Sequence, residues 1–453
     1  MRILQQADPN VRMLLGAPKP ASAGKTVLSV YVLSRSVGGQ TAAANLLTRQ
    51  LVLLDRSEEE TLRRLRAGET VDAGDPFADW LRREGWLVPA DRDETAFYLQ
   101  LYSLLREILQ PGPGFQTFTI LPTTACNARC VYCYEEGYRA VTMSRKTADE
   151  VTDFILTHRG RDSLKLAWFG GEPLAAHPII THICERLAAE GVDFTSTTTT
   201  NGTLFTPEVA DAAVSLWKLR SAIVSVDGCR ADYLSRKRFP SDGIDYYERM
   251  MNGVGLLLER GVEVLVSCNC DPDNIDGVTA FAGELMQRFG AYDRLTMQIP
   301  ALYSVRAGEQ HLPFSRIQRE KRKELQRMGV RFRETGFSPR LRFYRCKADL
   351  PESAVVIDPE GRLFACEHLA CMPPWGDVRG GVTDPAQWAY HRGEKPLREK
   401  CRGCMFLPEC TPFPDCPMPM HDCRDILSDG FAAAFEYTVS HAPSDREGAF
   451  DPC

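Results

Sequence analysis

The stretch Cys126-Asn-Ala-Arg-Cys130-Val-Tyr-Cys133 decides how the chain is interpreted. It sets three cysteines at C-x3-C-x2-C spacing, directly after the apolar residues 118–121 (Phe-Thr-Ile-Leu). Cysteine thiolates in short loops bind the irons of [4Fe–4S] clusters, and three thiolates on a cube of four irons leave one iron open. The alternative is a zinc knuckle without its fourth ligand. Zinc sites, however, pair C-x2-C with further cysteines or histidines, and the nearest histidine to Cys133 is His158.

Length and composition bound the class of protein. The chain has 453 residues, 44% hydrophobic and 25% charged, with a formal net charge of −6. These values are typical of a globular protein of about two to three domains and give no electrostatic reason to bind nucleic acid. We find no apolar run of signal-peptide or membrane-spanning length, so we expect a cytoplasmic protein without membrane attachment. Its 16 cysteines then indicate metal binding or catalysis rather than a disulfide framework.

Strand-like and helix-like patterns alternate between residues 113 and 310. Helix starts are readable at Thr147, at Thr206-Pro207 and at Asp245. Alternation of this kind predicts an α/β fold with a parallel sheet, and six βα units predict a partial, TIM-like (β/α)6 barrel. Catalytic groups of such barrels lie at the carboxyl ends of the strands, and the three cysteines follow the first strand. The predicted strands are residues 116–121, 164–169, 193–199, 221–226, 263–268 and 294–299.

The cysteine loop, with the aromatic Tyr132 before its last cysteine, resembles the signature of the radical S-adenosylmethionine (radical SAM) enzymes. The resemblance implies that Cys126, Cys130 and Cys133 hold a [4Fe–4S] cluster. It further implies that the amino and carboxylate groups of SAM bind the open iron. One electron then cleaves SAM to a 5′-deoxyadenosyl radical, which abstracts hydrogen from the substrate.

The same resemblance assigns a SAM pocket to the ends of the next strands. Gly170-Gly171-Glu172-Pro173 is similar to the family's GGE motif, whose carbonyls and Glu receive the SAM amino group. Paired glycines allow a close backbone approach, and a carboxylate suits an ammonium. A Gly-Gly pair is also common in ordinary turns.

Further polar residues at strand ends match positions that bind the ribose or methionine part of SAM in the family. A guanidinium binds a carboxylate through two hydrogen bonds, so an arginine after the fourth strand is the expected partner of the SAM carboxylate. We choose Arg238 over Arg236; a solvated surface arginine is the alternative for either. The other pocket residues expected are Thr200, Asn201, Ser225 and Asp227.

Cysteines become dense again in the C-terminal part, where their spacing resembles the SPASM domain, which holds two auxiliary [4Fe–4S] clusters. Residues 355–364 between the first two of these cysteines predict a β-hairpin with an Asp-Pro-Glu-Gly turn. By the resemblance, one cluster is enclosed by Cys401, Cys404, Cys410 and Cys423, and the other is held by Cys346, Cys366 and Cys416. A structural zinc ribbon built from the first four is the alternative.

Two departures from the SPASM pattern concern the second auxiliary cluster. Five residues separate Cys410 from Cys416 where three are usual, and no eighth cysteine lies in residues 339–345. That cluster therefore has an open iron or recruits Cys371, and an open iron accepts a soft ligand such as a substrate thiolate. Glu367 follows Cys366 at the position where sulfatase maturases carry an acidic base, so it is a candidate catalytic base; an ordinary solvated glutamate is the alternative.

A small unit precedes the barrel. Residues 27–33 and 45–54 are strand-like, and three helices are predicted to start at Ser57, at Asp75-Pro76 and before residues 97–108. This order resembles the RiPP recognition element, a winged-helix module that holds a leader peptide by β-augmentation. The alternative is an appendage that only packs against its neighbours.

The predicted organisation is a flexible lead-in (1–26), the recognition-like module (27–112), the radical SAM barrel (113–310), a linking helix (311–340), the SPASM domain (341–435) and a tail (436–453). It resembles maturases of ribosomally made peptides. We therefore predict an oxidoreductase that crosslinks a precursor peptide, with a Cys thioether favoured over C–C or C–O bonds, and that takes electrons from a flavodoxin or ferredoxin. The alternatives are a formylglycine-forming sulfatase maturase and, from another class, a non-catalytic iron–sulfur electron carrier or redox sensor.

Overall fold

The computed structural model describes residues 1–15, 25–71, 74–109, 112–160, 163–302, 311–333, 336–341, 353–368, 373–392, 397–409 and 423–442, with residues 311–316, 392 and 423–429 described by their backbone alone. Its largest element is a curved sheet whose first six strands run parallel and follow one another in chain order. These strands are β7 (Thr117–Thr123), β8 (Leu164–Gly170), β9 (Phe194–Thr200), β10 (Leu219–Val226), β11 (Glu263–Cys268) and β12 (Leu295–Gln298). The predicted parallel sheet is confirmed, with each strand within two residues of its expected bounds.

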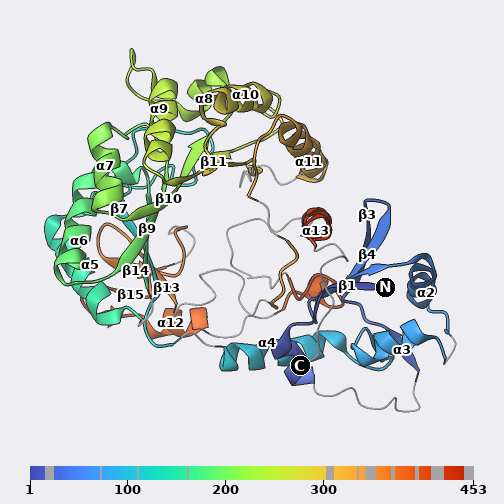
Figure 1. The fold of residues 1–453 in the computed structure, drawn as a ribbon. Coiled ribbons are helices and arrows are strands. Elements are labelled where there is room, and N and C mark those ends of the chain that lie inside the picture. Colours follow the sequence, from blue (N-terminus) through green and yellow to red (C-terminus); the bar gives the residue numbers. More distant parts are fainter. Residues whose placement is uncertain are drawn as a thin grey trace, which may run out of the picture.

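Helices cover the outside of the curved sheet (Figure 1). They are α5 (Arg145–His158), α6 (His177–Ala189), α7 (Pro207–Ser215), α8 (Arg230–Lys237), α9 (Tyr246–Glu259), α10 (Gly277–Phe289) and α11 (His311–Arg327), with a short 3-10 turn η1 (Pro173–Ala176) before α6. The predicted caps Thr206 and Asp245 accept hydrogen bonds from the helix backbone, as expected. The first helix begins earlier than predicted, because the hydroxyl of Ser144 rather than Thr147 caps it.

The two faces of the sheet differ in character. On the helix-covered face, alternate side chains such as Leu166, Val224 and Val264 are fully buried in the main hydrophobic core. On the other face, Thr197 is exposed and Ser225 is half-buried. Because strand side chains alternate between faces, the main core lies towards the helices. A smaller apolar cluster lies on the opposite face near β7 and consists of Leu121, Val356 and Phe364. Polar residues such as Thr197 and Ser225 remain accessible elsewhere on that face.

A β-hairpin extends the sheet beyond β7. Strand β13 (Ala354–Ile357) pairs parallel with β7, and β14 (Arg362–Phe364) returns antiparallel to it, as the predicted hairpin requires. The Asp358 carboxylate accepts hydrogen bonds from the backbone N–H groups of Glu360 and Arg362, and Gly361 takes a φ of 82°. Two short strands, β15 (Gly376–Asp377) and β16 (Gly381–Val382), and helix α12 (Pro385–Arg392) come next. The C-terminal part of the chain therefore begins as a continuation of the barrel sheet.

A second, four-stranded antiparallel sheet forms the N-terminal module, in the order β1-β5-β4-β3. Its elements are β1 (Arg2–Gln5), α1 (Pro9–Leu15), β3 (Val32–Val37), β4 (Gln40–Asn45), β5 (Gln50–Leu54), α2 (Arg56–Arg66), α3 (Pro76–Arg83) and α4 (Glu94–Ile108), with β2 (Thr26–Leu28) paired to β6 (Leu87–Pro89). Helices α2, α3 and α4 are the three that the sequence predicts.

The start of the chain was predicted wrongly. Residues 1–26 were expected to be a flexible lead-in, yet β1 pairs with β5 and α1 comes after it, so the expectation is wrong for residues 1–15; residues 16–24 lie outside the described ranges. The buried carboxylate of Asp8 explains why this segment is ordered: it accepts hydrogen bonds from the backbone N–H of Asn10 and from that of the distant Leu341.

Two local details of the N-terminal module also differ from the prediction. Two strands replace the single run 27–33, and α2 is capped by Asp55 in a capping box with Glu58, two residues before Ser57.

The N-terminal module packs against the C-terminal part of the chain. One hydrophobic cluster joins Tyr31 and Leu101 of the module to Phe406 and Phe431. Helix α13 (Cys423–Ser440) lies between α11 and the edge strand β3, and it continues past the boundary at 435 that the sequence predicted (Figure 1). The module is therefore held beside the barrel. No helix in the described ranges combines the length and apolarity needed to cross a bilayer.

Arg49 is the charged centre of this packing. Its side chain is 1% exposed and forms an ion pair with Glu409. Its Nε donates to the carbonyl of Ser338 over 2.9 Å, and its guanidinium lies 4.0 Å from the ring centroid of Phe337. A buried arginine is tolerated only when such partners replace water, so Arg49 ties the module to two C-terminal segments at once.

We predict that Arg49→Met destabilises the protein by about 3 kcal/mol or more, because it leaves the Glu409 carboxylate without its partner. Thermal unfolding and limited proteolysis measure the effect. Arg64→Met is the matched control: its pair with Glu69 is on the surface, and we expect a change of no more than about 0.5 kcal/mol. Equal effects of the two substitutions would contradict the role of Arg49.

Candidate functional site

The loop that carries the three cysteines starts where β7 ends. The backbone of the paired glycines Gly170 and Gly171 is in contact with its first residues. The backbone N–H of Gly171 donates to the Thr123 carbonyl over 3.2 Å, and that of Glu172 donates to the Ala125 carbonyl over 2.9 Å. Gly170 takes a φ of 118°, and a Cβ there would lie inside contact distance of the Thr123 oxygen. A Cβ on Gly171 would lie 2.5 Å from the Ala125 oxygen. The glycines therefore allow the end of β8 to touch the start of the cysteine loop.

A second contact joins the loop to the end of β9. The side-chain amide of Asn201 donates to the side-chain oxygen Oδ1 of Asn127 over 2.7 Å, and the side-chain amide of Asn127 donates to the Thr203 hydroxyl over 2.9 Å. Asn201 is 5% exposed and also accepts a bond from the backbone N–H of Thr203. The predicted residues Thr200 and Asn201 thus lie beside the cysteine loop, and Asn201 holds it directly.

The third contact is with the end of α8. The backbone N–H of Arg129 donates to the Lys237 carbonyl over 2.8 Å, and that of Val131 donates to the Arg236 carbonyl over 3.0 Å. The last carbonyls of a helix have no partner within the helix. Here the cysteine loop supplies the missing donors, so the loop is fixed at the ends of β8, β9 and α8.

The three thiols are gathered by this loop. Cys126, Cys130 and Cys133 are each half-buried and unbonded to other cysteines. Burial raises the pKa of Cys126 to about 12, opposed by the hydrogen bond from the Ala128 backbone; the neighbouring charges of Glu172, Cys130 and Cys133 raise it further. The pKa values of Cys130 and Cys133 are also raised, chiefly by burial. The neutral thiols are therefore favoured, and the three thiolates would form only with a cation bound to them, because thiolates repel one another.

Glu172 of the Gly-Gly-Glu motif is completely buried. Its Oε1 accepts hydrogen bonds from the Thr200 hydroxyl over 2.7 Å and from the Leu174 backbone N–H over 3.1 Å, while Oε2 accepts from the Asn201 backbone N–H over 2.8 Å. Burial raises the pKa of Glu172, and these bonds oppose the rise. Glu172 therefore links the ends of β8 and β9. Pro173 begins the 3-10 turn directly after it.

The sequence reasoning missed Lys237, the cation that the structure buries. Its side chain is 2% exposed and lies 3.5 Å from Oδ2 of Asp227, which is fully buried. Its Nζ donates to the Ser225 hydroxyl over 2.8 Å and to the Tyr132 hydroxyl over 3.1 Å. One signal was available: Tyr233 and Lys237 are four residues apart, so they lie on one face of α8, and both are buried.

The two predicted arginines occupy different surroundings. Arg238 ends α8 in the left-handed conformation, with a φ of 49°, and its side chain is exposed. Arg236 forms an ion pair with Asp271 at 2.5 Å. The predicted residues Ser225 and Asp227 lie at the end of β10 as expected, but the cation that contacts them is Lys237.

A family model described as "Radical SAM superfamily" matches residues 120–279, which span the barrel from β7 to the start of α10. The chain contains a radical SAM domain. A GTP 3′,8-cyclase of Haemophilus influenzae (strain PittEE) is 32% identical over 143 residues, 31% of this chain and 40% of that protein. A probable GTP 3′,8-cyclase of Methanothermobacter thermautotrophicus is 31% identical over 145 residues, 31% of this chain and 43% of that protein. This chain thus spans about two fifths of the curated relatives it matches.

Solved structures match more of the chain at lower identity. Native anSMEcpe with bound AdoMet covers 72% of this chain and 98% of that one, with a TM-score of 0.55 and 15% identity. Native anSMEcpe with bound AdoMet and Cp18Cys peptide covers 72% of this chain and 99% of that one, with a TM-score of 0.51 and 16% identity. At this identity, what the proteins share is the fold.

The radical SAM domain implies a [4Fe–4S] cluster and SAM, and the loop fits the cluster. Its donor set is three thiols on one short loop, which is iron–sulfur chemistry. Among the described residues, no three His, Cys, Asp or Glu side chains converge on a point that a single metal ion fills.

The candidate base Glu367 lies in a segment that approaches the cysteine loop, residues 124–133, called the radical SAM loop from here on. Oε2 of Glu367 lies 3.7 Å from Sγ of Cys366, and the imidazole of His368 packs against Tyr134 with ring centroids 4.2 Å apart. Tyr134 directly follows Cys133. Glu367 is therefore carried close to the radical SAM loop from a segment more than 200 residues away.

The structure describes some of the other SPASM-like cysteines and leaves the rest outside the described residues. Cys401 is buried, and Cys404 packs beside it in the cluster that joins the N-terminal module, where the Gly403 backbone donates to the Thr95 hydroxyl over 3.0 Å. Cys346, Cys371, Cys410 and Cys416 lie outside the described residues, as does the side chain of Cys423. The two predicted ligand sets stay predictions.

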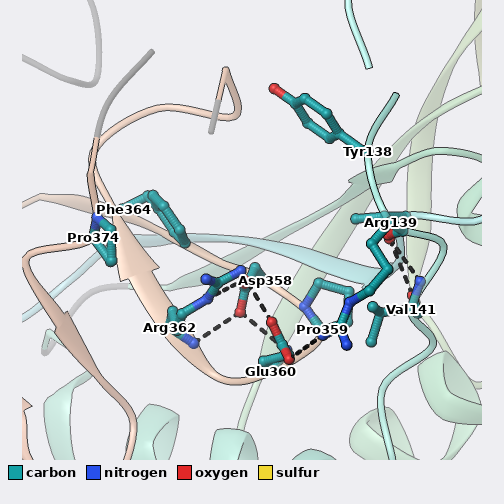
Figure 2. Close-up of a pocket in the computed structure, with 10 residues that line it drawn as sticks. Tyr138, Arg139, Val141, Asp358, Pro359, Glu360, Arg362, Phe364 and Pro374 are labelled. Atoms are coloured by element: carbon teal, nitrogen blue, oxygen red, sulfur yellow. Dashed lines mark hydrogen bonds and ion pairs between the residues drawn. The ribbon is translucent and has the colours of Figure 1, made fainter. Parts of the chain in front are cut away.

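A cavity of about 300 Å³ opens between the segment after the radical SAM loop and the β13–β14 hairpin. Its wall carries Tyr138 and Arg139 on one side and Glu360, Arg362 and other hairpin residues on the opposite side (Figure 2). The charges in the wall neutralise one another, because Arg139 pairs with Glu360 at 2.6 Å and Arg362 pairs with both Asp358 and Glu360. This cavity lies at the carboxyl edge of the sheet, beside the loop.

We predict that Gly170→Ala costs about 3 kcal/mol of stability, because the methyl group meets a backbone oxygen and φ is positive. Gly191→Ala is the matched control: its φ of 67° is also positive, but nothing lies within 4 Å of the added Cβ, so about 1 kcal/mol is expected. Thermal unfolding of both variants checks the difference. If Gly170→Ala were as stable as Gly191→Ala, the fold would not depend on the close contact between the end of β8 and the radical SAM loop.

Proposed function

We propose that the chain is a radical SAM enzyme that modifies a ribosomally made peptide by hydrogen abstraction and oxidative crosslinking. The observation that carries this proposal is the position of the three-thiol loop. It is fixed at the carboxyl ends of parallel strands, beside a concave face on which polar residues such as Thr197 and Ser225 remain accessible. The likeness in fold to anSMEcpe, solved with AdoMet and the Cp18Cys peptide, supports a peptide-sized substrate.

Different residues around the loop bind the cluster and the separate groups of SAM. Cys126, Cys130 and Cys133 hold the cluster, and SAM bound to it supplies a 5′-deoxyadenosyl radical on one-electron reduction. Glu172 and the carbonyls of Gly170 and Gly171 receive the SAM ammonium. We keep Arg238 as the partner of the SAM carboxylate, because the ammonium of Lys237 is enclosed and already directed to Asp227, Ser225 and Tyr132. Thr200, Asn201, Ser225 and Asp227 then line the remainder of the SAM site.

A thioether is the crosslink that we propose. The substrate loses one hydrogen atom from carbon, one proton from a cysteine thiol and one electron, and a C–S bond forms. Glu367 would take the proton, and an auxiliary cluster, which the SPASM-like cysteines would hold, would supply an acceptor for the electron. Glu367 is suited to this step because its segment lies against Tyr134, next to the radical SAM loop.

The N-terminal module is proposed to hold the leader of the precursor peptide. Its sheet ends in the outer edges of β1 and β3, and an extended peptide adds to a sheet edge through backbone hydrogen bonds. A flavodoxin or ferredoxin as reductant, and the cytosol as location, stay predictions from the sequence.

Formylglycine formation is the second candidate, because Glu367 directly follows Cys366 at the position that resembles the acidic base of sulfatase maturases. The two candidates differ in product mass. A thioether removes two hydrogens and leaves one cysteine unreactive to alkylation, whereas oxidation of a Cys or Ser to formylglycine leaves no crosslink. An anaerobic reaction with the peptide encoded beside the gene, read by mass spectrometry, decides between them.

We predict that the reconstituted, reduced protein releases 5′-deoxyadenosine from SAM, and that Cys130→Ala lowers the release at least about 100-fold, because the cluster loses a ligand. Chromatography of the nucleoside measures it. Cys184→Ala is the control, since this buried cysteine lies in the outer core and should leave the release unchanged. Intact clusters without any 5′-deoxyadenosine would instead identify an electron carrier or redox sensor.

We predict that Glu367→Gln still cleaves SAM but lowers peptide crosslinking about 10- to 100-fold, because the thiol proton loses its acceptor. The ratio of crosslinked peptide to 5′-deoxyadenosine measures this uncoupling. Glu399→Gln is the matched control: its side chain is 88% exposed and pairs only with the nearby Arg402 among the contacts described. An unchanged ratio in Glu367→Gln would leave Glu367 as an ordinary surface carboxylate.

A further inference from the structure

Two opposite charges lie buried beneath the radical SAM loop. Lys237 comes from the end of α8 and Asp227 from the end of β10, and their Nζ and Oδ2 atoms are 3.5 Å apart. Their side chains are 2% and 0% exposed. Solvent therefore screens neither charge, and each acts over several ångströms with a strength that surface charges lack.

Tyr132 connects this pair to the loop. Its hydroxyl donates to Oδ1 of Asp227 over 2.5 Å and accepts hydrogen bonds from Lys237 and from the Asn269 side chain, each over 3.1 Å. Tyr132 stands between Cys130 and Cys133 in the chain. Any cluster on these cysteines is thus one residue from a hydrogen-bonded network that contains both charges.

Both charges contact the loop through the same atom, the Tyr132 hydroxyl, which accepts from Lys237 and donates to Asp227. The two charges have opposite signs, so their effects on a cluster held by Cys130 and Cys133 on either side of Tyr132 are also opposite. Oδ2 of Asp227 is buried and receives no hydrogen bond from the part of the chain that the structure describes; its contact there is the ion pair with Lys237.

We propose that Lys237 and Asp227 are a pair of positioning residues that set the reduction potential of the radical SAM cluster, Lys237 raising it and Asp227 lowering it. Reduction adds one electron to the cube, and the protein's charges stay the same. A fixed cation nearby stabilises the added negative charge, and a fixed anion opposes it.

The proposal rests on the proposed function only in requiring a [4Fe–4S] cluster on this loop, so its test uses neither SAM nor substrate. The full-length chain is reconstituted with iron and sulfide, and the cluster is titrated with dithionite-poised mediators under EPR detection. A variant with Cys126, Cys130 and Cys133 all changed to Ala identifies the signal of this cluster by its loss. Failure of SAM cleavage with intact potential shifts would reject the proposed function alone.

We expect opposite shifts from the two substitutions. At a fixed poise, Lys237→Met lowers the ratio of reduced to oxidised cluster on the order of tenfold, and Asp227→Asn raises it by a similar factor. Lys237→Arg keeps the charge and should stay near the parent ratio. The double variant Lys237→Met, Asp227→Asn removes one charge of each sign and should also return towards it.

Shifts of the same sign in both single variants, or no shift in either, would overturn the proposal, as would a double variant that departs further than the single ones. Iron content and the EPR line shape report whether each variant carries the cluster. Should Lys237→Met lose its iron, Asp227→Asn and the double variant still decide: a raised ratio in the first and its reversal in the second support the charge pair, and any other result rejects it.

Discussion

The site depends on the attachment of the loop 124–133 to the ends of β8, β9 and α8. A loop with three cysteines is flexible by itself, and three thiolates that must meet one cube tolerate little motion. Three contacts hold the loop in place. Its backbone N–H groups donate to carbonyls at the end of α8, which have no partner within the helix, and its Asn127 side chain accepts from Asn201 after β9. Its first residues contact the backbone of Gly170 and Gly171, where a Cβ would not fit. Hydrogen bonds that orient the ligands of a metal site matter nearly as much as the ligands themselves.

The same attachment brings the charged groups together. Glu172 bonds to the residues of the neighbouring strand, and Lys237 donates both to Ser225 at the end of β10 and to Tyr132 within the loop. Buried charges are tolerated only when paired and hydrogen-bonded, so these side chains are locked in place by their mutual contacts. The result is a site with little freedom around the cluster, beside a concave face on which polar residues remain accessible.

Two other parts of the chain, the β13–β14 hairpin and the N-terminal module, pack around the site and its C-terminal neighbours. The β13–β14 hairpin joins the barrel sheet beside β7 and delivers Glu367 and His368 to the radical SAM loop. The N-terminal module, in turn, packs on the segment of Cys401 and Cys404. Sequence separation conceals both arrangements: residues at opposite ends of the chain share one core, held by groups such as Asp8 and Arg49.

The sequence by itself determined the parallel barrel, the cysteine loop and the strand-end residues, because strand periodicity, helix caps and cysteine spacing are local properties. It failed wherever burial or a distant partner decided the outcome. Residues 2–5 form a strand because β5 offers an edge, and Asp8 anchors the start of α1 to the distant Leu341 backbone. Lys237 is the buried cation, rather than either arginine beside it, because the turn of α8 points it inward to Asp227. Only the tertiary structure decided these points, since a charge is buried only where the folded chain supplies its partner.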